Sequence, residues 1–272
     1  MASTDESGAG PPPQGAEIRS PQPSDASAAV VATGQGDVVM SVVSMSQRHA
    51  EGRDAEYLEW HMLDHLPEQY RLPGLRAGTR WVSTPACRAA RLASEGSFDD
   101  VDHIVQYLFA EPVTEALDGF FALGAALRRA GRMPIGLPWV QVGGWDLIGA
   151  AATPRALVGA AVVPWRPATG AYVLVERRPD GHGASPSEAN ALLAVDGVVG
   201  AWTWGGGARR HDRLGDTDGL SLTLCYLDGN PLDVAARMGP LLAERWSDPR
   251  VDPQLAAPFH VVRAGEWDRS LP

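Results

Sequence analysis

The chain has 272 residues, a length that suits two globular modules of ordinary size. Of these residues 44% are hydrophobic and 21% are charged, which is close to the average of globular proteins. Its formal net charge of -10 argues against nucleic acid or an anionic membrane as the main partner, because both bind clustered cations. All 23 basic residues are arginine, so the chemistry of a Schiff-base, pyridoxal-phosphate or P-loop lysine is excluded.

The cysteines and the N-terminus indicate a reducing compartment. Cys87 and Cys225 are far apart and form neither a metal knuckle nor a disulfide framework. We expect Cys225 in the core; Cys87 follows Pro85 in a loop, where it can be exposed, and neither is assigned a role. No basic, apolar leader precedes the folded region, and no apolar run approaches the length of a membrane span. The sequence therefore predicts a soluble cytoplasmic protein without a membrane partner.

Residues 1–36, rich in Ser, Gly, Pro and Ala, are predicted to form a disordered tail. A first module is expected over 37–152, where Asp54 has the position of a helix N-cap and 83–100 read as a long polar, mobile loop. Hydrophobic periodicity predicts four strands and two helices in this module, with the strands over 38–43, 75–82, 102–109 and 138–145 and the helices over 54–70 and 111–130.

Residues 153–272 repeat this order more weakly, as a second, diverged module. Its first strand is either 157–163 or 172–176, and the pattern does not decide between them. The later elements are predicted at 187–193 (helix), 198–204 (strand), 220–226 (strand), 231–246 (helix) and 258–267 (strand).

Three features recur in both halves in the same order, at a spacing of about 120 residues. The first is a turn before the second strand, at Pro73-Gly74 and Asp196-Gly197. The second is a tyrosine in the third strand, Tyr107 and Tyr226. The third is a terminal Trp-Asp pair, at Trp145-Asp146 and Trp267-Asp268. We interpret them as a tandem duplication. The fold class predicted is α+β, with two tandem ferredoxin-like modules, each an antiparallel sheet with helices on one face.

The stretch Tyr57, Trp60, His61, His65-Leu66-Pro67-Glu68, Leu72-Pro73-Gly74 and Arg80-Trp81 resembles the dimeric α/β-barrel superfamily, and most of all its EthD-like branch. The resemblance implies that the two modules pair within one chain as a pseudo-dimeric barrel. It also implies a small-molecule site, since the superfamily includes monooxygenases, cyclases, isomerases, dehalogenating enzymes and haem enzymes. The corresponding helix of the second half has no histidine, so we expect only the first half to carry a site with polar catalytic side chains.

Tyr57, His61 and His65 are the candidate catalytic residues. They fall at i, i+4 and i+8, and therefore share one face of the predicted helix, with Asp64 and Glu68 on its flank. Imidazole titrates near neutrality, and a carboxylate commonly fixes its tautomer. Alternatively, His61 is a satisfied helix histidine and His65 caps the helix C-terminus.

Further substrate-binding candidates are Trp60, Asp64, Arg80, His103 and Tyr107. His103 and Tyr107 share one face of a strand and can meet the helix residues or a ligand if that face looks into the barrel. Arg80 can bind a carboxylate or enolate oxygen, and Trp60 can line an apolar pocket. Alternatively, His103 has a structural role and takes no part in binding or catalysis.

The spacing of His61 and His65 also suits two helical zinc ligands, but Glu is absent between them, so no metal is predicted. We also predict no cofactor. The leading hypothesis is an enzyme that moves a proton in an apolar aromatic or polyketide-like molecule: an isomerase, cyclase or lyase, with a cofactor-free oxygenase as a variant. The alternative is a non-catalytic module that binds a ligand or associates with protein, including a second copy of itself.

Overall fold

A computed structural model describes residues 37–178, 186–207 and 210–272. The first half contributes four barrel strands in the spatial order β2-β4-β1-β5. The second half contributes four strands in the order β7-β8-β6-β9, which is the same topology. The strand bounds are β1 (Val38–Ser46), β2 (Leu75–Val82), β4 (His103–Ala110), β5 (Trp139–Ala152), β6 (Gly170–Arg177), β7 (Val198–Gly205), β8 (Leu220–Leu227) and β9 (Asp252–Val261).

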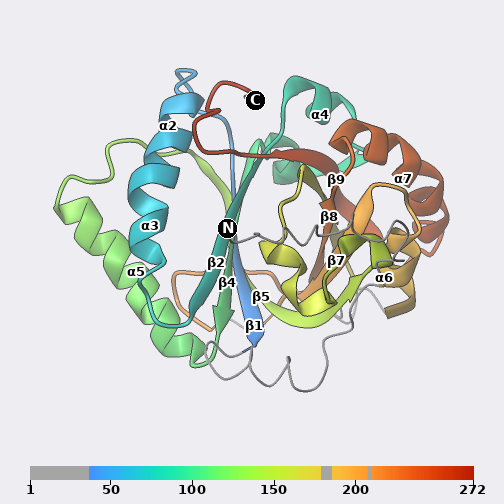
Figure 1. Cartoon of the computed structure of the whole chain (residues 1–272), viewed down its shortest axis with the longest axis horizontal. Helices are drawn as coiled ribbons and strands as arrows, with labels where there is room; N and C mark the ends of the chain where they lie inside the picture. Colours follow the sequence, from blue (N-terminus) through green and yellow to red (C-terminus); the bar gives the residue numbers. More distant parts are fainter. Residues whose placement is uncertain (1–36, 179–185, 208–209) are drawn as a thin grey trace, which may run out of the picture.

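Two antiparallel contacts between the halves close these strands into one eight-stranded barrel. β5 pairs with β7 from Asp146↔Gly205 to Ala152↔Gly200, and β2 pairs with β9 through Trp81↔Val261 and Val82↔His260. The predicted fold class is therefore confirmed: two ferredoxin-like modules form an α/β barrel within a single chain (Figure 1).

The helices cover the outside of the barrel (Figure 1). In the first half these are α2 (Asp54–Trp60), the π-helical segment η1 (His61–His65), α3 (Leu66–Gln69) and α5 (Val113–Arg129). In the second half they are α6 (Pro186–Leu193) and α7 (Pro231–Arg245). None of the helices in the described ranges combines the length and the apolar character needed to cross a membrane.

Large aromatic side chains fill the barrel interior. Trp81, Trp145, Trp202, Trp204 and Phe259 belong to one cluster and are at most 2% exposed. Because side chains alternate along a strand, neighbouring residues of β4 pack into two different layers.

Along β4, Ile104 and Leu108 join the barrel cluster, whereas Val105 and Tyr107 pack against the helices. His103 shares the face of Val105 and Tyr107 by strand alternation. The face that carries His103 and Tyr107 thus looks away from the barrel, toward the helix layer.

Several local expectations were wrong. The predicted mobile loop contains α4 (Pro85–Ala89), the short strand β3 (Ala93–Ser94) and the turn η2 (Gly96–Asp100), and β3 adds to β9. Cys87 within it is fully buried, whereas the core position expected for Cys225 is confirmed. The N-cap position of α2 is Arg53, so Asp54 is the first helical residue and its carboxylate serves another purpose.

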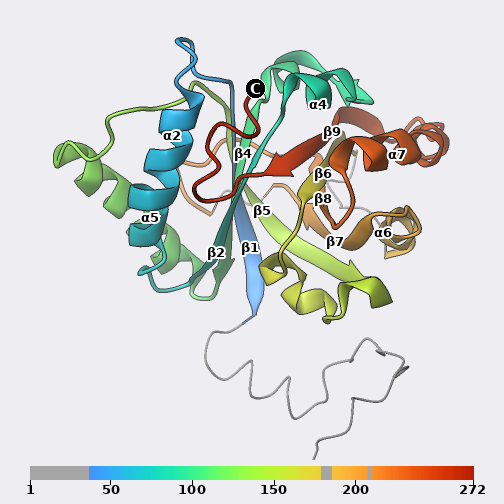
Figure 2. The same ribbon diagram turned by 45° about the horizontal axis from the view of Figure 1, so that its top comes forward.

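In the second half, β6 is the first strand, which settles the choice that the sequence left open. Residues 157–163 instead lie between and within the short turns η3 (Pro154–Ala156) and η4 (Ala160–Trp165). The segment after β9 returns to the first half (Figure 2). There Trp267 and Leu271 pack near Leu58 and Val82.

Of the three recurring features, the turn recurs structurally. Gly74 and Gly197 have φ of +84° and +96°, and a Cβ on either would lie 2.6 Å from a side-chain atom of α5 or α7. The other two features are not equivalent in space. Tyr107 faces the helices whereas Tyr226 faces the barrel interior, and Trp145 lies within β5 whereas Trp267 follows β9.

Candidate functional site

The helical run α2-η1-α3 carries most of the predicted site across the outer face of β2 and β4. The run widens at η1, where the Leu66 N–H donates to the carbonyl of His61, five residues earlier. Pro67 accounts for this widening, because it has no N–H for the carbonyl of Leu63 and its ring crowds that carbonyl. A π-helical turn relieves the conflict, and such turns occur frequently at functional sites.

Despite the wider turn, the predicted residues stay adjacent. The ring centroids of Tyr57 and His61 are 6.0 Å apart, and those of His61 and His65 are 5.5 Å apart. Opposite them, Gly78 of β2 leaves room for the helix, since a Cβ there would lie 2.5 Å from a methyl carbon of Leu66. The helix therefore packs directly on the sheet, and the polar side chains are enclosed between the two.

His61 is 2% exposed and uses both ring nitrogens. Its Nε2 lies 2.9 Å from the Tyr107 hydroxyl, and its Nδ1 accepts from Arg80 Nε at 3.3 Å. An arginine can only donate, so neutral His61 carries its proton on Nε2 and donates it to Tyr107. Burial first, and then the charge of Arg80, lower the pKa of His61 well below its usual value.

Arg80 lies at the centre of the group and is 3% exposed. Its Nη2 donates to the Tyr57 hydroxyl at 2.8 Å, and the guanidinium carbon lies 4.7 Å from the centre of the Tyr57 ring. Its Nη1 is buried and has no hydrogen-bond partner. Arg80 forms no ion pair with any carboxylate in the part of the chain that the structure describes.

A buried guanidinium without a counterion is unfavourable, because buried charges are normally paired. Arg80 contributes to lowering the pKa of His61, His65 and His103, although burial is the larger cause for each. Burial raises the pKa of Tyr107. The histidines are consequently neutral at neutral pH, and the guanidinium of Arg80 carries a positive charge within the enclosed group.

His65 is buried under Trp60, whose ring stacks on it at 5.2 Å. Its Nε2 lies 3.1 Å from the side-chain nitrogen of Gln69, one helical turn further on. Its Nδ1 is buried and has no partner. Burial, and then the charge of Arg80, lower the pKa of His65 to about 4.

His103 forms a buried pair with Asp54, with His103 Nε2 2.8 Å from Asp54 Oδ1. The same oxygen accepts the backbone N–H of His49 at 2.8 Å. Burial acts to raise the pKa of Asp54, but these two hydrogen bonds outweigh it and the pKa is lowered. Burial lowers the pKa of His103, against the opposing effect of the Asp54 hydrogen bond.

Two predicted residues lie on the solvent side of the helix. Asp64 and Glu68 both form ion pairs with Arg132, at 3.0 and 2.8 Å, in the segment between α5 and β5. The Trp60 indole N–H donates to the backbone carbonyl of Arg132 at 3.0 Å. Asp64 therefore does not face the histidines as a carboxylate partner, and Trp60 forms the outer cover of His65.

Sequence reasoning missed Asp54 and Gln69 as members of this site. Gln69 is four residues after His65 on the same helix, a spacing that could have found it. The partner of Asp54 is 49 residues away in the chain, and no local spacing indicates such a contact.

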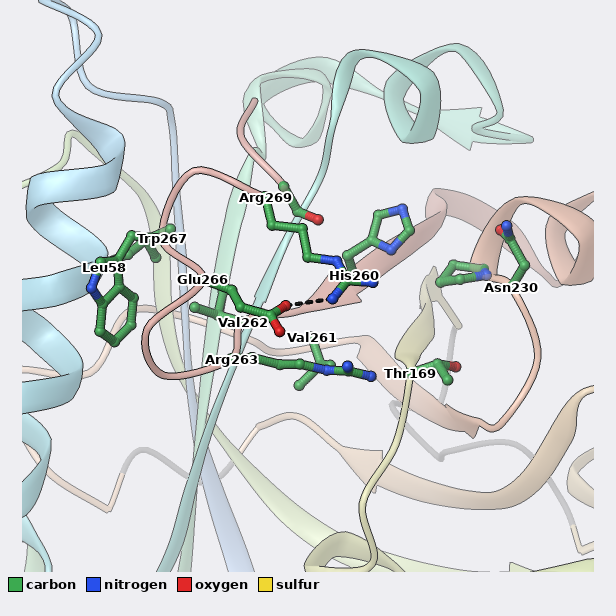
Figure 3. Close-up of a pocket in the computed structure, with 12 residues that line it drawn as sticks. Leu58, Thr169, Asn230, His260, Val261, Val262, Arg263, Glu266, Trp267 and Arg269 are labelled. Carbon is green, nitrogen blue, oxygen red and sulfur yellow. Dashed lines mark hydrogen bonds and ion pairs between the residues drawn. The ribbon is translucent and has the colours of Figure 1, made fainter.

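The described residues contain no group of three or more His, Cys, Asp or Glu side chains arranged to hold a metal ion. Two cavities lie beside the site rather than within it. The first, about 180 Å³, is formed by the segment after β9 and the start of α7 (Figure 3). Leu58 and Trp267 border it on the side of α2, while Arg263, Glu266 and Arg269 project into its middle (Figure 3). The second cavity, about 330 Å³, includes Arg48, Arg88 and Asp102 in its wall.

No protein-family model matches the chain, and no curated protein matches its sequence. Similar solved structures include an anthrone oxidase-like protein, with 12% identity, a TM-score of 0.49, and 85% of this chain and 95% of that chain covered. A candidate monooxygenase from Fusobacterium nucleatum subsp. nucleatum has 8% identity, a TM-score of 0.49, and 84% and 93% coverage. A candidate chlorite dismutase has 14% identity, a TM-score of 0.48, and 85% and 97% coverage. We draw no activity from these likenesses, and the EthD-like resemblance stays a prediction.

Proposed function

We propose that this chain is an enzyme that moves a proton in a small, largely apolar molecule and stabilises the oxyanion that results. One observation carries the proposal: Arg80 is a buried guanidinium with no carboxylate partner among the described residues and with an unpaired Nη1. A developing oxyanion supplies the charge that such a group lacks, and the low dielectric of a buried site strengthens the interaction.

The role of each residue follows from which of its polar atoms have no hydrogen-bond partner. Arg80 and the Tyr57 hydroxyl bind the oxyanion, and Tyr57, the partly exposed member of the group, lies where a ligand reaches it. His65 keeps one ring nitrogen without a partner and can exchange a proton directly. His61 has both nitrogens engaged, so it holds Arg80 and Tyr107 in place.

The surroundings favour an apolar and aromatic substrate. Met62, Leu66 and Phe120 belong to the cluster that includes Tyr107, and the rings of Phe120 and Tyr107 meet edge to face at 4.9 Å. Isomerisation next to a carbonyl proceeds by proton transfer through an oxyanion, and many cyclisation and lyase reactions of carbonyl compounds begin with the same step, so these residues fit all three. A cofactor-free oxygenase would use the same oxyanion.

We further propose that residues 37–152 and 153–272 are two modules that arose by tandem duplication, and that the site is confined to the first. The common strand order and the paired glycines Gly74 and Gly197 support this. The part of α6 in the described ranges has no histidine, so this helix does not carry the group that the first half encloses.

The test uses 1-tetralone, an enolisable aromatic ketone, and 1-naphthol, whose anion has the shape and charge of the tetralone enolate. We expect the full chain to bind 1-naphthol in its anionic form, seen as a shift in its ultraviolet absorption, and to accelerate deuterium uptake by 1-tetralone in heavy water. Arg80→Met should weaken naphtholate binding by about tenfold or more, as expected for loss of one charge-assisted hydrogen bond. Arg132→Met is the matched control, since its guanidinium lies on the outer side of the same helix, and it should bind as the wild type does.

Equal weakening by both variants, or binding of neutral naphthol alone, would contradict the oxyanion role of Arg80. The second candidate function is non-catalytic ligand binding, which the complete pairing of His61 favours. Naphtholate binding that depends on Arg80, without any deuterium uptake by 1-tetralone, would select that alternative.

A further inference from the structure

The buried pair of Asp54 and His103 is the second place in this site where a ring nitrogen is free. The His103 side chain is 1% exposed and that of Asp54 is 6% exposed. Asp54 Oδ1 accepts two hydrogen bonds, from His103 Nε2 and from the His49 N–H, both at 2.8 Å. A carboxylate held by a backbone donor is fixed in position, so it in turn fixes the ring of His103.

The pair also decides which nitrogen of His103 carries the proton. An ionised carboxylate only accepts, so the neutral ring must carry its proton on Nε2 to make the 2.8 Å bond. The lone pair then lies on Nδ1, which is buried and has no hydrogen-bond partner. Burial keeps the pKa of His103 below its usual value, so the ring is neutral and able to accept a proton at neutral pH.

The strand register places His103 on the same outer face of the sheet as Arg80. On the outer face, His103 is opposite Val82 and Tyr107 is opposite Gly78, so Arg80 lies diagonally between His103 and Tyr107. The ring of Tyr57, whose hydroxyl accepts from Arg80 Nη2, meets the His103 ring edge to face at 6.1 Å.

The other two histidines are less suited to the task. His61 has no free nitrogen. His65 has a free Nδ1, but Asp64 is turned away to Arg132 and only the neutral amide of Gln69 contacts the ring. His103 alone among the three combines a free nitrogen with a carboxylate that sets the tautomer.

We propose that Nδ1 of His103 is the proton acceptor of this site and that Asp54 is its positioning residue. The inference rests on the proposed function. In the step, a C–H bond next to a substrate carbonyl breaks, the proton moves to Nδ1 and the electron pair moves to the carbonyl oxygen. That oxyanion lies against Arg80 Nη1 and the Tyr57 hydroxyl. Return of the proton to a different atom completes an isomerisation, with no oxidant or co-reactant.

The first experiment needs no substrate. Nitrogen-15 NMR of the full wild-type chain with labelled histidine reports which ring nitrogen of each residue is protonated. We expect His103 to carry its proton on Nε2 alone at neutral pH, and Asp54→Ala to remove this preference. A doubly protonated ring, or a proton on Nδ1, in the wild-type protein would overturn the inference, even if every variant failed to fold.

The second experiment separates the inference from the proposed function. His103→Gln should slow deuterium uptake by 1-tetralone at least about 100-fold, the lower range for general base catalysis, while naphtholate affinity changes less than about threefold. His211→Gln, on the β7–β8 connection, is the control and should keep both properties. If His65→Gln abolishes uptake and His103→Gln retains it, the base is His65 and the inference is wrong. If the wild type neither binds naphtholate nor exchanges tetralone, the proposed function fails, and the NMR result alone decides the tautomer.

Discussion

Replacement of His65 by glutamine should change how the stability of the protein depends on pH. His65 is buried beneath Trp60 and near the charge of Arg80, and both the burial and the charge oppose protonation of its ring. Glutamine can still contact Gln69 but cannot titrate. The variant therefore removes one proton-binding group from the buried site without leaving a charge behind.

The magnitude follows from the shift in pKa. An unfolded chain binds a proton on histidine with a pKa of 6.5, whereas in the folded protein the pKa of His65 is about 4. The unfolded state takes up the proton first, so stability is lost as pH falls below 6.5, and the loss is complete below about 4. The loss is about 2 kcal/mol at about pH 5 and reaches a limit of about 3 kcal/mol.

The assay is urea denaturation of the full chain at about pH 7.5 and at about pH 5. Carboxylates also titrate in this range, so the informative quantity is the difference between wild type and variant. We expect His65→Gln to lose about 2 kcal/mol less than the wild type between the two conditions. Equal losses in His65→Gln and the wild type would refute the description of His65 as a buried neutral base.

Three further substitutions test the packing of the two modules. Gly74→Ala should lower the free energy of unfolding by about 2 kcal/mol, because φ is +84° and the new Cβ would lie 2.6 Å from that of Ala116. Gly124→Ala lies within α5 and has no atom within 4 Å of the new Cβ, so it should instead raise the free energy of unfolding by about 0.5–1 kcal/mol. If thermal denaturation shows that both glycine substitutions change stability in the same direction, this reasoning is contradicted. Glu176→Gln removes the buried carboxylate that binds Arg245 and should cost about 3–5 kcal/mol, and a cost below about 1 kcal/mol would show that the ion pair contributes little.

The architecture was predictable because it depends on the order of elements. Strand and helix periodicity gave the ferredoxin-like order, and the turn before the second strand of each half marks a real equivalence at Gly74 and Gly197. The aromatic repeats misled because a strand turns its side chains alternately to two faces. A tyrosine at a similar sequence position can therefore face the barrel, as Tyr226 does, or the helices, as Tyr107 does.

The site was predictable only where its members share one element. Tyr57, His61 and His65 lie on one helical run, so their proximity followed from spacing. Contacts between distant segments gave no such signal. Asp54 reached His103 across the chain, and Asp64 turned to Arg132 because the segment after α5 crosses the outer side of the helix.

The most direct test of the central claim is a crystal structure of the full chain with bound 1-naphtholate. The naphtholate oxygen should lie within hydrogen-bond distance of Arg80 Nη1, with the rings against Met62, Leu66 and Phe120. Naphtholate found instead beside Arg263 and Arg269 in the cavity next to α7, with Arg80 Nη1 still unpaired, would contradict the claim that the charge of Arg80 defines the site.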